Sequence, residues 1–444
     1  MTGISGVPYR WYVAAQCVSL VGTTMTLAGL YWLAVQVTHG NGLFLSTVVA
    51  LQFLPVLLFS RRTGVLVSRF RPARLLMITQ SLLLAGSLGY AIPLFAGWMA
   101  PWYLCLLTFT LGFVTTVDVP ARQMFMLDLV GGDQLRRGMS LYGTFTGLAK
   151  IIGPSLAGVI IAVKGEGAVF AADSASFLFV IFVLVRFAGD IGHRAETSPG
   201  RTPRRFRWVL DLPVRIQLIA GLALLFGGFG YQFEVTNPLM ATEVFHLGSA
   251  GYGIMGTCIA IGGILGNFYS SRRPDPGIPE ILAWTSLFGL AEAAAAIMGS
   301  PWGYDLFMLL IGIATSLFAS SSTVYIQRTA PEESRGNSLA AYNAGFMGFV
   351  PAGAFVVAAI ASSAGVRWAL IGPGLAMIAF TALAAQLLSG KSGQAKAVND
   401  VRRQKRQRRR EREQPAVPGA QVNQASGYRR PDDLGHGIRD VHDP

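Results

Sequence analysis

The stretch M-S-L-Y-G-T-F-T-G-L-A-K-I-I-G-P-S-L-A-G-V-I-I-A-V (139–163) is almost wholly apolar, yet it carries a lysine and a Gly-Pro pair near its centre. As a helix it is long enough to cross the roughly 30 Å hydrocarbon layer of a bilayer. An unpaired charge at mid-bilayer costs at least about 2.5–3.5 kcal/mol. The sequence therefore predicts a membrane-spanning helix with one face packed against protein, where Lys150 finds a polar partner.

The composition of the whole chain agrees with a membrane environment. Of the 444 residues, 52% are hydrophobic and 13% are charged, whereas soluble domains carry about 25% charged residues. Apolar stretches of similar length recur and predict an all-α polytopic membrane protein with twelve transmembrane helices. The expected spans are about 11–37, 43–66, 74–95, 100–119, 138–163, 167–188, 214–239, 249–270, 279–298, 303–325, 337–363 and 366–388.

Arginine placement predicts the orientation of these spans. The connections after the second and sixth spans are rich in arginine, whereas residues 38–42 and 96–101 contain neither lysine nor arginine. Because positively charged loops stay on the cytoplasmic side, we expect a multi-pass protein of the inner (plasma) membrane with both termini in the cytoplasm. The first span is too long for a signal peptide and is kept as a true span.

The net charge of +13 resides in these loops and in the tail segment R-R-Q-K-R-Q-R-R-R-E-R (402–412). A basic cluster beside a membrane is attracted to anionic lipid by about 1 kcal/mol per residue. We therefore expect the tail to contact anionic lipid or to fix topology, and we expect no nucleic-acid partner. Specific binding of RNA or of another protein by the tail is the alternative.

The two groups of six spans contain similar motifs at corresponding positions. R-R-G-M-S-L (136–141) and G-P-S-L-A-G (153–158) in the first group correspond to S-R-G-N-S-L (334–339) and V-P-A-G-A (350–354) in the second. Two parallel six-helix halves are the architecture of major-facilitator transporters, whose substrate site lies near the bilayer midplane. The expected parts are 1–188 (first half), 189–213 (central cytoplasmic loop), 214–389 (second half) and 390–444 (basic tail).

The sequence lacks the motifs that are typical of several other function classes. The chain has no phosphate-binding G-x-x-x-x-G-K-[ST] motif for an ATP motor. Its three cysteines are scattered within predicted spans and give no disulfide or metal spacing. We expect no enzyme activity, no metal, no cofactor and a monomeric protein.

Five stretches form a recognisable set of motifs. They are A-L-Q-F-L-P-V-L-L-F (50–59), D-V-P-A-R-Q-M-F-M-L-D-L-V (118–130), K-I-I-G-P-S-L-A-G (150–158), F-A-A-D-S-A-S-F (170–177) and P-L-M-A-T-E-V-F-H-L-G-S-A-G-Y-G (238–253). These motifs resemble the drug:proton antiporter branch of the major facilitator superfamily, which includes the enterobactin exporter and macrolide efflux proteins. The resemblance covers about residues 10–388. It implies the major facilitator fold and export of a small amphipathic molecule.

The resemblance also points to a cytoplasmic gate, with one departure. The loop after the second span resembles G-x-x-x-D-R-x-x-R, but here reads G-V-L-V-S-R-F-R-P-A-R (64–74), so Ser68 replaces the aspartate. Asp118 and Arg122 are four residues apart, a spacing at which they can meet on one helix face. The predicted gate residues are Gly64, Ser68, Arg69, Arg74, Asp118 and Arg122. The alternative for Asp118 and Arg122 is an exposed ion pair of little energetic value.

Small residues form a stripe on the helix that contains Lys150. On a helical wheel, four of them and Lys150 fall within about an 80° arc, and small residues allow helices to approach closely in lipid. We predict a pliable seam between helices, loosened by the proline, with static packing as the alternative. The seam residues are Gly143, Gly147, Gly153, Pro154 and Gly158.

Charged groups in the spans are the candidates for proton coupling. By helix rise, Lys150 and Asp173 lie about 18 Å and about 21 Å above the cytoplasmic boundary, which suggests a buried ion pair; a proton-coupling role or no contact are alternatives. Glu234 lies in a span that lines the cavity in this fold, and burial favours the protonated form of a carboxylate. A solvated carboxylate at the outer boundary is the alternative for Glu234.

The predicted cavity residues are polar or aromatic and lie on the expected lining spans, although each could instead be a packing residue. They are Gln16, Thr23, Gln36, Tyr103, Thr108, Thr116, Tyr231, Asn237, Ser316, Thr323 and Tyr325. A mostly apolar pocket with scattered hydrogen bonders suits amphipathic ligands. We therefore predict a proton-coupled exporter that works by alternating access. The alternatives are a dedicated siderophore or metabolite secretion protein and a non-transporting membrane scaffold.

Overall fold

The structure, a computed structural model, describes residues 7–38, 40–130, 135–187, 212–230, 232–272, 276–330 and 332–386. Residues up to Leu387 form one compact unit. The predicted tail and nearly all of the predicted central loop lie outside the described residues. The first half comprises α1 (Val7–Val37), α2 (Gly42–Arg69), α3 (Pro72–Ala96), α4 (Pro101–Val130), α5 (Leu135–Lys164) and α6 (Glu166–Phe187).

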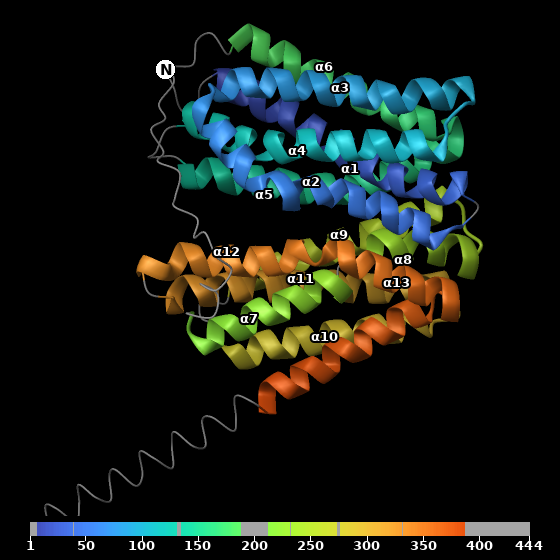
Figure 1. Cartoon of the computed structure of the whole chain (residues 1–444), viewed down its shortest axis with the longest axis vertical. Coiled ribbons are helices and arrows are strands. Elements are labelled where there is room, and N and C mark those ends of the chain that lie inside the picture. Colours follow the sequence, from blue (N-terminus) through green and yellow to red (C-terminus); the bar gives the residue numbers. More distant parts are fainter. Residues whose placement is uncertain are drawn as a thin grey trace, which may run out of the picture. The chain divides into compact units, whose positions relative to one another are not determined.

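The second half contains the remaining helices, which form a second bundle beside the first (Figure 1). They are α7 (Val214–Leu225), the π-helical turn η4 (Phe226–Gly230), α8 (Phe233–Leu239), the π-helical turn η5 (Met240–Val244), α9 (Ser249–Ser271), α10 (Ile278–Ala296), α11 (Pro301–Thr329), α12 (Glu332–Gly348), α13 (Val350–Ala364) and a final helix, Trp368–Gln386. The helical fold class predicted from the sequence is confirmed.

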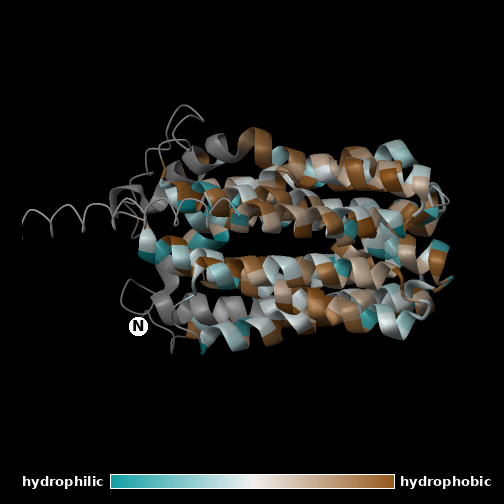
Figure 2. Ribbon diagram, turned by 90° about the horizontal axis from the view of Figure 1, so that it is seen from below, coloured by the Kyte–Doolittle hydropathy of each residue, from teal (hydrophilic) through white to brown (hydrophobic). Residues whose placement is uncertain are grey.

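Eleven helical segments in the described residues are long and apolar enough to cross a membrane. The remaining predicted span corresponds to α10, a helix of 19 residues that packs against α11. Two glutamates, Glu280 and Glu292, lower its hydropathy. Hydrophobic residues run along most of the helix lengths (Figure 2).

Two predicted spans are interrupted rather than continuous helices. The seventh contains the sequence F-G-G-F-G, which forms η4 and separates α7 from α8. The eleventh breaks at Phe349, between α12 and α13, and Pro351 follows in the first turn of α13. Proline lacks a backbone N–H and clashes with the carbonyl of the preceding turn, which accounts for the second interruption.

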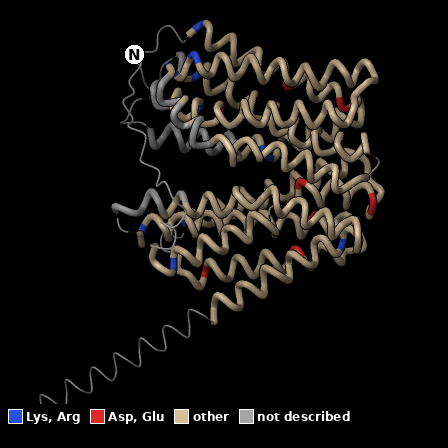
Figure 3. Tube along the Cα trace, in the orientation of Figure 1, with Lys and Arg blue, Asp and Glu red and all other residues tan. Residues whose placement is uncertain are grey.

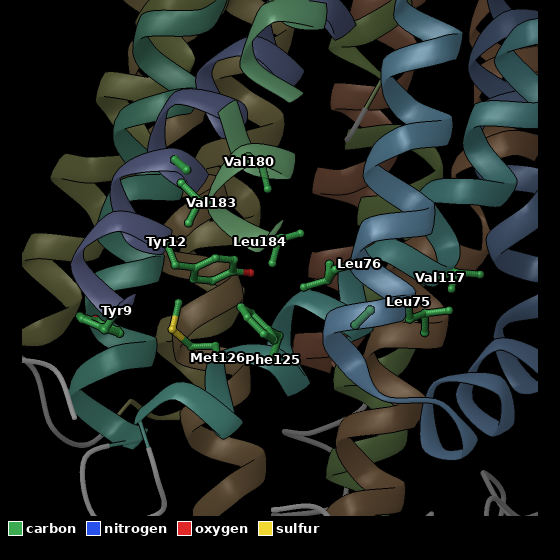
Figure 4. Packing of buried hydrophobic residues seen from close by; sticks show 12 residues of the cluster. Tyr9, Tyr12, Leu75, Leu76, Val117, Phe125, Met126, Val180, Val183 and Leu184 are labelled. Carbon is green, nitrogen blue, oxygen red and sulfur yellow. The ribbon is translucent and has the colours of Figure 1, made fainter. Parts of the chain in front are cut away.

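The first half is held together by a hydrophobic core near the ends of its helices (Figure 4). Side chains from α1, α3, α4 and α6 meet there. Tyr12 and Phe125 pack edge to face with their ring centroids 4.7 Å apart. The cluster consists of Tyr9, Tyr12, Ala15, Leu75, Leu76, Val117, Ala121, Phe125, Met126, Val180, Val183 and Leu184. Four of the six helices are thereby fixed relative to one another.

The two ends of the bundles differ, and we name them for clarity. The terminal end is where α1 begins at Val7; the distal end is where α1 ends at Val37. Most basic residues of the described helices lie at the terminal end, and most acidic residues lie in the middle or toward the distal end (Figure 3). Four exposed tryptophans, Trp98, Trp102, Trp302 and Trp368, lie at the distal end beside helix termini. Tryptophan favours the membrane–water interface, so these side chains mark one membrane surface.

Among the described helices, four pairs carry the main contacts between the halves: α5 with α9, α2 with α13, α1 with α8, and α2 with α8. Ser46 on α2 donates a hydrogen bond of 2.9 Å to the carbonyl oxygen of Ala354 on α13. Ser249, at the start of α9, donates one of 3.1 Å to the carbonyl oxygen of Gly158 on α5. Both bonds lie toward the distal end, so the two halves are joined there.

Candidate functional site

A polar bridge connects three helices between the two halves. The hydroxyl of Tyr31, on α1, lies 2.8 Å from Oε1 of Gln52, on α2, and 2.8 Å from Oε2 of Glu234, on α8. Tyr31 is only 3% exposed, whereas Glu234 is half-buried. The predicted coupling residue therefore lies at an interface between the halves, and not in a solvated position at the outer boundary.

The local sequence explains why Glu234 reaches α1. The π-helical turn η4 ends at Gly230, and α8 begins at Phe233 after a residue with non-helical backbone angles, Gln232. This interruption changes the direction in which the following residues point. Glu234 consequently projects from the first turn of α8 toward Tyr31.

Lys150 lies on the inner side of α5. The exposed apolar side chains Leu148, Ile152 and Val159 form the outer face of α5, and at about 100° per residue Lys150 points roughly 160–180° away from them. The carbonyl oxygens on either side of it are bound from two helices: Ala149 accepts from Thr24 on α1 and Ile151 from Thr257 on α9. Lys150 is thus exposed between α1 and α9, away from lipid.

The predicted ion pair between Lys150 and Asp173 is wrong. Asp173 is 1% exposed and accepts hydrogen bonds from Thr26, at 2.8 Å, and Ser176, at 3.0 Å. A Cβ atom at Gly22 would overlap Oδ1 of Asp173, so only glycine admits the carboxylate at that point of α1.

Asp118 and Arg122 form a buried ion pair rather than an exposed one. Nε of Arg122 lies 2.5 Å from Oδ2 of Asp118, and the residues are 7% and 1% exposed. Thr79 and Gln80, on α3, donate to Oδ1 of Asp118 at 2.6 and 2.8 Å. These bonds compensate the cost of burying the carboxylate and tie α3 to α4.

The other predicted gate residues do not join this network in the described part of the chain. Arg74 is exposed on α3. The side chains of Gly64, Ser68 and Arg69 lie outside the described residues.

The predicted seam residues of α5 lie between α1 and α9. A Cβ atom at Gly158 would come within 2.6 Å of the carbonyl oxygen of Ser249, and one at Gly253 within 2.6 Å of that of Pro154. A Cβ at Gly153 would overlap Thr24. Gly147 is less crowded, with Ile264 3.8 Å from its Cβ position. The helices therefore approach each other most closely toward the distal end. The surroundings of Gly143 lie outside the described residues.

The predicted cavity residues occupy varied surroundings. Several bond within their own half: Thr108 pairs with Tyr90 at 2.9 Å, and Asn237 accepts from Tyr304 at 2.7 Å. Thr23, Thr116 and Thr323 donate to carbonyl oxygens of their own helices, Tyr103 packs against Trp98 and Trp102, and Ser316 lies beside Gly266. Gln16 is buried, Tyr325 half-buried and Gln36 exposed, and Tyr231 lies outside the described residues.

Sequence reasoning missed two residues of the bridge, Tyr31 and Gln52. Gln52 had a usable signal, because it is the single polar residue in the apolar run A-L-Q-F-L-P-V-L-L-F. An isolated polar residue within a span requires a partner. Tyr31 had no such signal, since a tyrosine near a span end is also typical of an interfacial anchor.

Two six-span halves with a polar bridge between them define a membrane transporter of the major facilitator type. The chain belongs to the family of transmembrane secretion effectors within that superfamily, whose family model matches residues 4–413. This membership establishes a transporter rather than an enzyme, and it disfavours the scaffold alternative.

Individual relatives are distant. The chain is 22% identical over 343 residues to the Staphyloferrin A transporter of Staphylococcus aureus (strain NCTC 8325 / PS 47), covering 74% of this chain and 84% of the relative. It is 22% identical to the uncharacterized MFS-type transporter YfiS of Bacillus subtilis (strain 168), covering 73% of this chain and 79% of the relative.

Solved structures share the fold at low identity. A POT family transporter in complex with 5-aminolevulinic acid superposes with a TM-score of 0.69 at 11% identity, covering 88% of this chain and 98% of the other. A bacterial homologue of the iron transporter ferroportin in an inward-facing state gives a TM-score of 0.64 at 15% identity, covering 84% and 98%. These likenesses concern the fold alone.

Proposed function

We propose that the protein exports a small amphipathic molecule by proton-coupled antiport, with Glu234 as the residue that carries the proton. The observation that carries this proposal is the bridge from Glu234 to Tyr31, because it places a carboxyl group at a junction between the two halves. A group whose protonation state affects such a junction can link proton binding to alternating access.

The number of protons available to the bridge supports this role. The hydroxyl of Tyr31 has one hydrogen, yet two oxygen acceptors lie 2.8 Å from it. A protonated Glu234 resolves the deficit, since its carboxyl O–H donates to Tyr31 while Tyr31 donates to Gln52. The bridge is therefore complete when Glu234 carries a proton.

Loss of that proton changes the electrostatic balance around Glu234. The carboxylate then has a single hydrogen bond from Tyr31 to share with Gln52. We propose that this exchange weakens the distal junction and permits the halves to rock. Asp173, buried against α1, has a positioning role in this scheme.

The remaining features of the proposal concern orientation and surroundings. Basic residues at the terminal end support a cytoplasmic location of both termini in the plasma membrane. We propose that the Asp118–Arg122 network contributes to the cytoplasmic gate and that the seam between α5 and α9 flexes. We also propose that the half-buried polar residues line the cavity and that the basic tail binds anionic lipid. A monomer is sufficient for this mechanism.

One alternative has specific support. The relative named as a Staphyloferrin A transporter favours a dedicated siderophore or other metabolite secretion protein over a drug pump. A narrow substrate range in an export panel would establish that alternative, whereas protection against several unrelated drugs would establish the broader pump.

The test is an accumulation and toxicity panel in cells that lack their own efflux pumps, with and without a protonophore. We expect expression to lower accumulation of a substrate, the protonophore to abolish the effect, and Glu234→Gln to abolish it as well. Glu243→Gln is the matched control, because Glu243 lies in the same span but is exposed. Increased accumulation on expression would overturn export, and unchanged export by Glu234→Gln would remove it from coupling.

A further inference from the structure

The two interrupted helices of the second half meet at one buried side chain. Gln232 is 2% exposed and stands between η4 and α8. Its Nε2 atom donates to the carbonyl oxygen of Gly227, at 3.0 Å, and to that of Val350, at 3.2 Å. Gly227 belongs to η4, and Val350 is the first residue of α13. One amide thus ties the break in the seventh span to the break in the eleventh.

The backbones at these breaks touch without intervening side chains. A Cβ atom at Gly227 would overlap the carbonyl oxygen of Phe346, and one at Gly353 would overlap that of Gly228. Closely packed backbones have no soft side chain between them to absorb a displacement. A shift of η4 and α8 is therefore transmitted to α13.

Each of the connected segments also reaches the first half of the transporter. Glu234, two residues after Gln232, bonds with Tyr31 on α1. On α13, Ala354 accepts from Ser46 on α2. A Cβ atom at Gly42, at the start of α2, would lie 4.0 Å from Cβ of Ala358. The contact between α2 and α13 near the distal end is called here the α2–α13 seam, defined by Gly42, Ser46, Ala354 and Ala358.

We propose that Gln232 is a positioning residue that couples the protonation state of Glu234 to closure of the α2–α13 seam. This inference rests on the proposed role of Glu234 as the proton-carrying group. The amide of Gln232 acts through the backbone, because its Nε2 atom bonds to two carbonyl oxygens. It holds the start of α8 against α13, so that making or breaking the Glu234–Tyr31 bond moves both segments together.

Closure of the seam can be followed with a pair of engineered cysteines. The Gly42→Cys/Ala358→Cys pair suits a disulfide, because the Cβ separation of 4.0 Å lies within the usual range of about 3.5–4.5 Å. Cys17, Cys105 and Cys258 are replaced by alanine in this background. The rate of disulfide formation in native membranes under a mild oxidant reports how often the seam is closed.

The experiment is a double-mutant cycle in the full-length chain. We expect Glu234→Gln, which mimics the protonated carboxyl and so favours the closed seam, to raise the cross-linking rate by about fivefold or more, the lower end of typical couplings between sites. In the Gln232→Met background, the same Glu234→Gln change should have almost no effect. In the Gln217→Met background its effect should be retained, because Gln217 bonds to Leu212 at the start of α7, away from the break.

Two results would overturn the proposal: an equal effect of Glu234→Gln with and without Gln232→Met, or no effect of Glu234→Gln on the seam at all. If Gln232→Met does not reach the membrane, Gln232→Asn replaces it, because the shorter amide cannot reach both carbonyl oxygens. Failure of the proposed transport function is recognised separately, as wild-type export that a protonophore does not affect.

Discussion

Tyr31 on α1 and Glu234 on α8 are 203 positions apart in the chain, yet the hydroxyl of one lies 2.8 Å from the carboxyl oxygen of the other. This bond joins the first span of the chain, in the first half, to the seventh span of the chain, in the second half. Because the same hydroxyl also contacts Gln52 on α2, three helices depend on a single side chain.

Replacing Tyr31 by phenylalanine should weaken closure of the distal end. A hydrogen bond between neutral groups, such as Tyr31 and protonated Glu234, contributes about 0.5–1.5 kcal/mol, so we expect the cross-linking rate of the α2–α13 seam to fall by about two- to tenfold, with export reduced. Tyr304→Phe is the control, because Tyr304 bonds to Asn237 within the second half. A wild-type rate in Tyr31→Phe would show that the bridge does not hold the halves together.

Asp118→Asn should destabilise the first half. Breaking a buried ion pair from one side costs about 3–5 kcal/mol, and the Arg122 guanidinium would be left without its carboxylate. The measurement is thermal unfolding of the purified protein in detergent. Arg74→Gln should change stability by no more than about 0.5 kcal/mol because Arg74 is exposed. Equal stability of the two variants would contradict the buried network.

Gly253→Ala should impair export, because the new Cβ would meet the carbonyl oxygen of Pro154 at 2.6 Å. Overpacking of this kind costs about 1–3 kcal/mol and would separate α5 from α9. Gly263→Ala lies on the same helix with nothing within 4 Å of its Cβ position, and should export normally. Export is measured as substrate efflux at matched expression. Two equally active variants would show that the close approach has no role.

Exchanging Lys150 and Asp173 should fail to restore function. Lys150→Asp is expected to abolish export because it replaces a cation by an anion on the side of α5 that faces α1 and α9. Adding Asp173→Lys should not restore export, since a lysine cannot replace the acceptor of Thr26 and Ser176. Efflux by the single and double variants decides the matter. Recovery in the double variant would revive the ion pair that the structure contradicts.

The fold could be predicted from the sequence because it depends on hydropathy averaged over long segments. Apolar stretches of the right length define helices in a bilayer whatever their neighbours are, so each predicted span has a counterpart. The interruptions at η4 and at Phe349 were not predicted, because hydropathy does not report backbone geometry. F-G-G-F-G and Pro351 were the available signals, and glycine and proline are common in membrane helices.

For the candidate site, the sequence could point to single residues but not to their partners. Glu234 is a candidate because a carboxyl group within a span is unusual. The partner of Lys150 was not, because matching depth along the membrane says nothing about rotation of a helix around its axis. Asp173 lies at a suitable depth but faces Gly22 and Thr26 on α1.

The four exposed tryptophans at the distal end place the bilayer itself within the energetics of transport. Trp98 and Trp102 belong to the first half, and Trp302 and Trp368 to the second. Any tilt of one half relative to the other lifts or sinks its pair of indoles relative to the lipid headgroups, and deforms the membrane around them. We therefore expect lipid thickness and elasticity to contribute to the conformational equilibrium.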